Sequence, residues 1–100
     1  MSQICYVITN AAYPDWVKIG FTSKSEMTSR LRVYQTGSPF RDYEVYHEVL
    51  FDDAKLAEKE VHKRLKQMGA TSKNEWFKIS KRLASNMIDA VFDDIDNGLL

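Results

Sequence analysis

The chain has 100 residues and a formal net charge of zero. This length corresponds to one domain, residues 1–100, that can bury its own core, and the neutral balance argues against a general binder of polyanions. The charges are nevertheless segregated. Basic residues predominate in segments 16–41 and 54–82, whereas the segment from Leu83 onwards carries four aspartates and no basic residue. The sequence therefore permits a basic face.

The first 21 residues predict a β-hairpin. Residues 4–9 form an apolar run of β-forming side chains, residues 13–15 supply turn chemistry, and residues 16–21 continue as a second strand. Because side chains alternate along a strand, Lys18 and Gly20 share one face of the second strand with Trp16. The other face carries Val17, Ile19 and Phe21. A charged lysine in this position indicates either that this face of the strand is exposed to water or that the lysine has a function.

The N-terminal segment also bears on the compartment. Cys5 is the single cysteine and cannot form an internal disulfide, which suits a reducing compartment or a buried thiol. The segment lacks the basic and apolar regions of a signal peptide, and no run approaches the roughly 20 apolar residues of a membrane span. We expect a soluble, cytoplasmic protein with no membrane partner.

A helix is predicted after the hairpin. Ser23 with Glu26 three residues later fits a capping box, and Gly37 gives a stop signal. Arg30 lies beside the apolar stripe of this helix and must border the core. The stripe has the spacing i, i+4 and i+7 and consists of Met27, Leu31 and Tyr34.

Residues 43–51 alternate well enough to predict a third strand. Its apolar positions, expected on one side, are Tyr43, Val45, Val49 and Phe51.

Asp52 or Asp53 can cap the next helix, which is predicted to end at Gly69. On this helix Glu58 lies at the edge of the apolar stripe, whereas Glu60 lies on the other flank. Glu58 is therefore the carboxylate expected beside the core. The stripe consists of Ala54, Ala57, Val61, Leu65 and Met68.

The chain ends with a polar loop, a short strand or extended anchor at 76–79, and a helix capped by Ser80. The predicted fold class is α+β. A small three-stranded antiparallel sheet is flanked by helices in the order β-β-α-β-α, with a core of about residues 4–79 and a C-terminal helix of about 81–97.

These elements and motifs resemble the GIY-YIG nuclease superfamily. Tyr6 resembles the tyrosine of the first motif, and Ile19-Gly20 resembles the end of the second. Arg30-Leu31 with Tyr34 resembles the family helix, and Glu58 resembles its metal-binding glutamate. Ile4 and Cys5 depart from the parent first motif, and Lys18 stands where it has a second tyrosine.

The resemblance is closer to a small phage and microbial branch in which K-I-G replaces Y-I-G. Its other marks are a glutamate four residues before a histidine, here Glu58 and His62, and a closing E-W-F at residues 75–77. The resemblance covers about residues 4–79.

This resemblance implies a metal-dependent endonuclease that hydrolyses phosphodiester bonds in DNA. Glu58 would hold one Mg²⁺ or Mn²⁺, which takes oxygen ligands and keeps several waters. Arg30 would brace the scissile phosphate through its planar donors, and Tyr6 would orient or deprotonate the water with support from Tyr34. Lys18 would contact a phosphate or favour the phenolate of Tyr6. His62 would be an accessory residue.

The expected nucleic-acid contacts are basic residues of the hairpin and the first two helices, namely Lys18, Arg30, Arg32, Lys55, Lys59 and Lys63. A module of this size would need a homodimer or a protein partner for specificity.

Two other classes of function stay open. One is a nucleic-acid-binding module that has kept the fold and lost turnover. The other is a small phage protein that acts through a host protein, with the acidic final helix as its docking surface. The individual residues also have plain structural explanations, because Tyr6 fits a strand aromatic and Arg30 could simply pair with Glu58.

Overall fold

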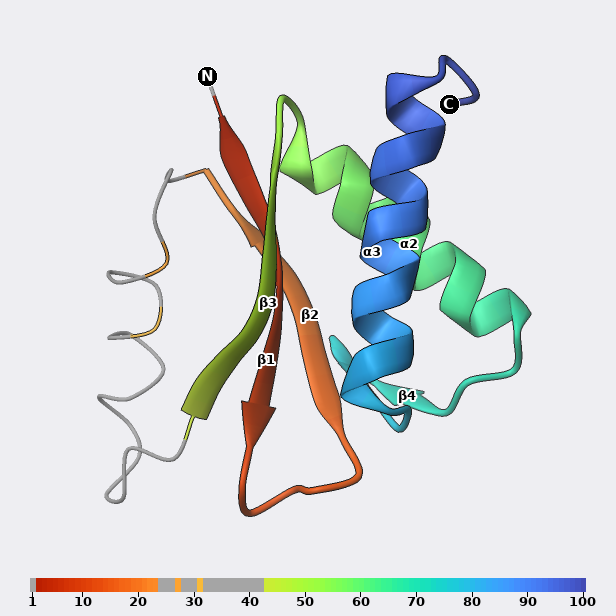
Figure 1. Ribbon diagram of the computed structural model, residues 1–100. Coiled ribbons are helices and arrows are strands. Elements are labelled where there is room, and N and C mark those ends of the chain that lie inside the picture. Colours follow the sequence, from red (N-terminus) through yellow and green to blue (C-terminus); the bar gives the residue numbers. More distant parts are fainter. Residues whose placement is uncertain (1, 24–26, 28–30, 32–42) are drawn as a thin grey trace.

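The structure, a computed structural model, describes residues 2–23, 27, 31 and 43–100 (Figure 1). It confirms the α+β class. The described elements are β1 (Gln3–Asn10), β2 (Val17–Thr22), β3 (Tyr43–Phe51), α2 (Ala54–Gln67), β4 (Ser72–Lys73), β5 (Trp76–Phe77) and α3 (Lys81–Asp96). Within these residues, no helix combines the length and apolar character needed to cross a membrane.

One antiparallel sheet in the order β3-β1-β2-β5-β4 organises the molecule. The predicted hairpin is confirmed, because β1 and β2 pair from Ile4–Thr22 to Thr9–Val17. The predicted three strands form the main part of the sheet. The two-residue strands β4 and β5 extend it beyond β2, so the short strand or anchor predicted at 76–79 is the strand β5, which lies between β2 and the edge strand β4.

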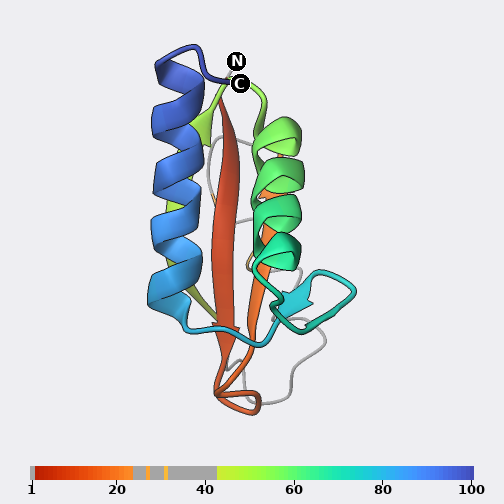
Figure 2. The same cartoon turned by 90° about the vertical axis from the view of Figure 1, so that its right-hand side faces the viewer.

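Both α2 and α3 cover the same face of the sheet, side by side (Figures 1 and 2). The main core lies between this face and the helices, and it includes Val7, Ile19, Phe77, Val61 and Ile88, all fully buried. A second, smaller core lies on the other face of the sheet, where Met27 packs with the members of β1 that point away from the helices, Ile4, Tyr6 and Ile8.

The third strand differs from its prediction. Val49 and Phe51 pack in the main core, but Tyr43 and Val45 pack against the second core. The reason is a β-bulge. Val7 pairs with His47 and Ile8 pairs with Val45, so one extra residue of β3 shifts the alternation between the two halves of the strand.

The predicted caps of the last two helices are confirmed. The Asp53 side chain accepts a hydrogen bond from the N–H of Leu56 at 3.1 Å, and Ser80 Oγ accepts one from the N–H of Leu83 at 3.0 Å. The stripe predicted on α2 is buried except at its end. Met68 is the C-cap residue, beyond the last residue of the helix, and is 58% exposed.

Candidate active site

Tyr6 and Gly20 lie directly opposite each other on β1 and β2. The Tyr6 ring crosses over Gly20, since a Cβ atom built on this glycine would lie 2.6 Å from Tyr6 Oη. Only glycine leaves room for the ring, which explains its position in the I-G motif. Tyr6 itself is fully buried in the second core.

Lys18 lies on the same face of the sheet as Tyr6, because it is two residues from Gly20 on β2. Its ammonium group lies 3.4 Å from Glu75 Oε2, and the side chain is 19% exposed. Glu75 precedes β5, whose Trp76 pairs with Lys18 across the sheet. The lysine of the K-I-G motif therefore pairs with the glutamate of the E-W-F motif.

Glu58 and His62 approach β2 from α2 at the strand's open edge. Among the described residues, β5 pairs only with Val17 and Lys18. The N–H of Ile19 donates to the Glu75 carbonyl at 3.2 Å, but the Ile19 carbonyl has no described strand partner on that side. His62 Nε2 donates a hydrogen bond to this carbonyl at 2.8 Å, and the His62 ring packs edge-on against Phe77. Because a carbonyl can only accept, Nε2 carries the proton.

Glu58 lies one helical turn before His62, with 3.8 Å between Glu58 Oε1 and His62 Nε2. The Glu58 side chain is 15% exposed. Its Oε2 atom is buried and has no hydrogen-bond partner among the residues that the structure describes. A buried carboxylate oxygen without a donor is costly, and a cation is one way to satisfy it.

The electrostatics of Glu58 follow from this position. Burial, with a smaller contribution from the Glu75 carboxylate, raises the pKa of Glu58 from 4.5 to about 7, although the Lys18 and Lys55 charges oppose the shift. Burial lowers the pKa of His62. His62 is therefore neutral at neutral pH, and its contact with Glu58 is not an ion pair there. Perturbed carboxyl groups of this kind are enriched at functional sites.

An open hollow of about 760 Å³ lies beside Glu58. We call it the lysine hollow, because four lysines line it at helical spacing together with Glu58, His62, Phe21 and Gln67. The lysines are Lys55, Lys59, Lys63 and Lys66. Such a surface suits a phosphodiester backbone with a bound cation, because the lysines can contact the phosphates and the carboxyl group can bind the cation.

The described residues contain no group of three or more His, Cys, Asp or Glu side chains that could hold a metal ion. A divalent ion at Glu58 would therefore depend on one carboxylate, with waters and substrate oxygens as its other ligands. Mg²⁺ binds in this way, whereas structural zinc does not. The unpartnered Oε2 and this donor set fit Mg²⁺ or Mn²⁺.

The structure brings only some of the predicted site residues together. The Lys18 charge acts on the Glu58 carboxyl group, and Lys55, Lys59 and Lys63 line the lysine hollow with Glu58. Tyr6 shares a sheet face with Lys18, whereas Glu58 approaches from the helix-covered face at the edge of β2. The predictions for Arg30, Arg32 and Tyr34 fall outside the described residues.

Sequence reasoning missed two contributors. Glu75 was visible in the E-W-F motif, but nothing in the sequence placed its carboxylate beside Lys18 and Glu58. Lys66 could have been found from its spacing, since it lies three residues after Lys63 on the same helix.

The chain matches the family model described as the T5orf172 domain over residues 3–93. No curated protein and no solved structure matched it.

Proposed function

The chain belongs to the T5orf172 domain family, and from this premise we propose that it is a metal-dependent endonuclease that hydrolyses phosphodiester bonds in DNA. Domains of this family occur in phage and bacterial proteins related to nucleases. The observation that carries the proposal is Glu58, which lines the lysine hollow and whose buried Oε2 lacks a partner among the described residues.

The chain's own residues divide the work of binding between them. Lys55, Lys59 and Lys63 neutralise the phosphates of a strand in the lysine hollow, and release of condensed counterions favours this binding. Lys18 supplies a further cation near Glu58 and exchanges its contact with Glu75 for a phosphate. His62 keeps α2 in register with β2 through its bond to Ile19, which positions Glu58 one turn away.

Glu58 would hold the Mg²⁺ or Mn²⁺ ion. When bound, such an ion stabilises the negative charge that develops on the phosphate and favours the ionised form of a nearby water. The Glu58 carboxyl must lose its proton to act as a ligand. Since its pKa is about 7 in the free protein, ion binding and proton release are coupled near neutral pH.

The residues implied by the GIY-YIG resemblance complete the proposal. Tyr6 orients the attacking water, with support from Tyr34, and Arg30 braces the scissile phosphate. These roles rest on the resemblance, and for Tyr6 also on its position beside Gly20 and Lys18 on the sheet.

The test compares Glu58→Gln with Glu60→Gln in a Mg²⁺-dependent plasmid-nicking assay. Glu58→Gln should lower the cleavage rate by at least ~10²-fold, the usual scale for losing one main electrostatic contributor, while DNA binding is retained. Glu60 is a matched control because its carboxylate pairs with Arg64 at 3.1 Å and does not line the hollow. Equal nicking by wild type and Glu58→Gln would refute the proposal and indicate a contaminating nuclease.

One observation favours a second candidate, a DNA-binding module without turnover. Tyr6 is fully buried, which removes its hydroxyl from direct contact with a strand on the surface. In that case wild type would bind DNA with a steep salt dependence and show no metal-dependent cleavage. Affinity that does not change with salt would instead point to a protein partner.

A further inference from the structure

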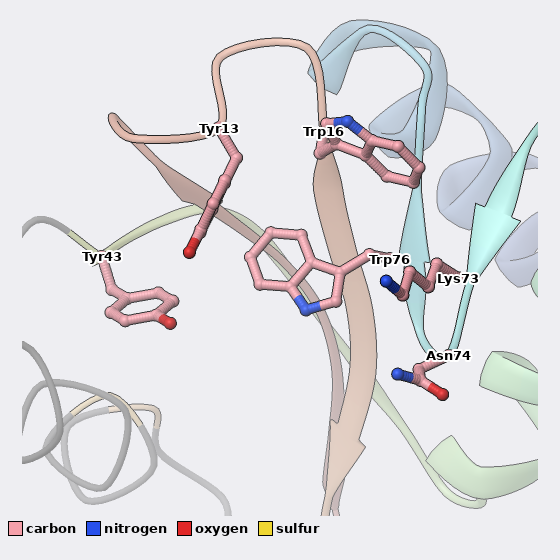
Figure 3. Close-up of a pocket in the computed structure, with 6 residues that line it drawn as sticks. All are labelled: Tyr13, Trp16, Tyr43, Lys73, Asn74 and Trp76. Carbon is pink, nitrogen blue, oxygen red and sulfur yellow. The ribbon is translucent and has the colours of Figure 1, made fainter.

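A second pocket lies between the β1–β2 connection, the start of β3 and the β4–β5 hairpin. It has a volume of about 310 Å³, and its lining is mainly aromatic. The lining residues are Tyr13, Trp16, Tyr43, Lys73, Asn74 and Trp76 (Figure 3). We call it the aromatic pocket. The nuclease proposal makes no use of these residues.

Three separate segments build the aromatic pocket. Tyr13 and Trp16 come from the β1–β2 connection, Tyr43 from the start of β3, and Lys73, Asn74 and Trp76 from the β4–β5 hairpin. Trp76 lies between the two tyrosines on one side and Lys73 and Asn74 on the other (Figure 3). The Tyr13 and Trp76 rings meet edge-to-face, with 5.8 Å between their centroids.

The polar residues of the pocket are held by the hairpin. Asn74 has φ +57°, in the left-handed region that a two-residue turn between paired strands requires and that Asn tolerates. Its side-chain amide can both donate and accept hydrogen bonds, as the edge of a nucleobase requires. Lys73 adds one positive charge at the same place.

The aromatic pocket is linked to Lys18 by the strand pairing of the sheet. Lys73 pairs with Trp76 across β4 and β5, and Trp76 pairs with Lys18 across β5 and β2. Directly paired residues of an antiparallel sheet project from the same face, so Lys73, Trp76 and Lys18 form one row. A strand that contacts Lys18 through a phosphate therefore passes beside Trp76.

We propose that the aromatic pocket holds one unpaired nucleobase of the DNA strand on which the enzyme acts. This inference rests on the proposed function and deepens it. Aromatic faces stack on any base, and a basic groove beside them follows the backbone. The volume of the pocket lies at the lower end of the range for small-molecule sites, about 300–1,000 Å³, which suits a single base rather than a larger ligand.

The substrate class follows from this occupancy. A base within a duplex has both faces stacked and its pairing edge occupied, so it can enter the pocket only after it leaves the stack. The protein should therefore prefer DNA with single-stranded stretches, such as gaps, overhangs or branches, over a continuous duplex.

The two tryptophans of the chain, Trp16 and Trp76, both line the pocket, so tryptophan emission reports directly on its occupancy. Oligothymidylate should quench the emission in metal-free buffer, where cleavage cannot occur. A fully paired hairpin duplex of equal charge should quench it much less. Oligothymidylate is the appropriate probe because thymine stacks without forming structure in the strand.

Tyr13→Ala is the test variant because Tyr13 is 52% exposed and its removal should leave the fold intact. It should weaken oligothymidylate binding by about 5- to 150-fold, the range for losing one stacking ring. Lys73→Ala should weaken the same binding and lower its salt dependence. Tyr46→Ala is the matched control, since Tyr46 is also an exposed tyrosine but lines neither this pocket nor the lysine hollow.

The outcomes separate this inference from the nuclease proposal. Quenching that Tyr13→Ala removes supports the base pocket even if wild type cleaves nothing, in which case only the nuclease proposal fails. Cleavage without quenching overturns the base pocket alone. Equal quenching by oligothymidylate and paired hairpin, or quenching by a polyproline peptide instead of DNA, also overturns it.

Discussion

Replacing Gly20 by alanine should destabilise the protein through a single contact. The new Cβ would lie 2.6 Å from Tyr6 Oη and 2.8 Å from Cζ, where ordinary contact begins at 3.4 Å. The hydroxyl would have to recede by about 0.8 Å. Because Tyr6 is fully buried in the second core, the ring cannot turn into solvent, and the strain must pass to its neighbours.

The magnitude follows from two opposing terms. Overpacking a buried site costs about 1–3 kcal/mol, whereas exchanging glycine for alanine within a strand recovers roughly 0.5–1 kcal/mol of conformational entropy. We expect a net loss of about 1–2 kcal/mol. For a domain of this size, each kcal/mol lowers Tm by about 4–8 °C. Urea denaturation and thermal melts followed by circular dichroism would measure both quantities.

A double-mutant cycle with Tyr6→Leu identifies the cause. If the Tyr6 ring is the obstacle, Gly20→Ala should cost much less in the Tyr6→Leu background than in the wild type, with a coupling of about 0.5–2 kcal/mol. Gly20→Ala as stable as wild type would show that the ring does not lie over β2. A destabilised variant with no coupling would place the clash elsewhere.

Three further predictions concern the helices and the main core. Because the native state holds the Glu58 proton between pH 4.5 and about 7 while the unfolded state does not, stability should fall as pH rises through this window. The free energy of unfolding, measured in EDTA, should fall less between pH 4.5 and 8 in Glu58→Gln than in the wild type, by roughly 1–3 kcal/mol. Identical pH profiles of the two proteins would contradict this prediction. Arg64 Nη2 of α2 lies 2.6 Å from Asp94 Oδ2 of α3. A double-mutant cycle to alanine, followed by urea denaturation, should therefore give a coupling energy of about 0.5–1 kcal/mol, and a coupling of zero would show that this ion pair does not stabilise the helix packing. Burial raises the pKa of Cys5 to about 12, so a thiol reagent at pH 8 should react only as fast as the protein unfolds; immediate reaction would show that the thiol is accessible.

The last two helices could be predicted from the sequence because their signals are local. Asp53 and Ser80 each accept a hydrogen bond from the backbone N–H three residues later, so the cap and its partner are neighbours in the chain. Gly69 and Gly98 follow the helix ends with φ of +83° and +72°, the conformation that glycine adopts most easily. The hairpin pattern was equally local.

The faces of β3 could not be predicted in the same way. A β-bulge depends on the pairing of two strands, and the extra residue lies within a run whose alternation looks regular. The side of the sheet reached by Tyr43 and Val45 was therefore decided by β1.

The candidate site was likewise predictable only where its features follow from a local pattern. The sequence by itself placed Glu58 at the edge of an apolar stripe and Lys18 on the face of its strand opposite Val17, Ile19 and Phe21, because both positions follow from the period of one element. Only the tertiary structure brought Glu75 beside Lys18, put His62 on the open carbonyl of Ile19, and raised the pKa of Glu58. These effects arise from burial and from charges that are distant in the chain, and no local pattern encodes a distance between elements.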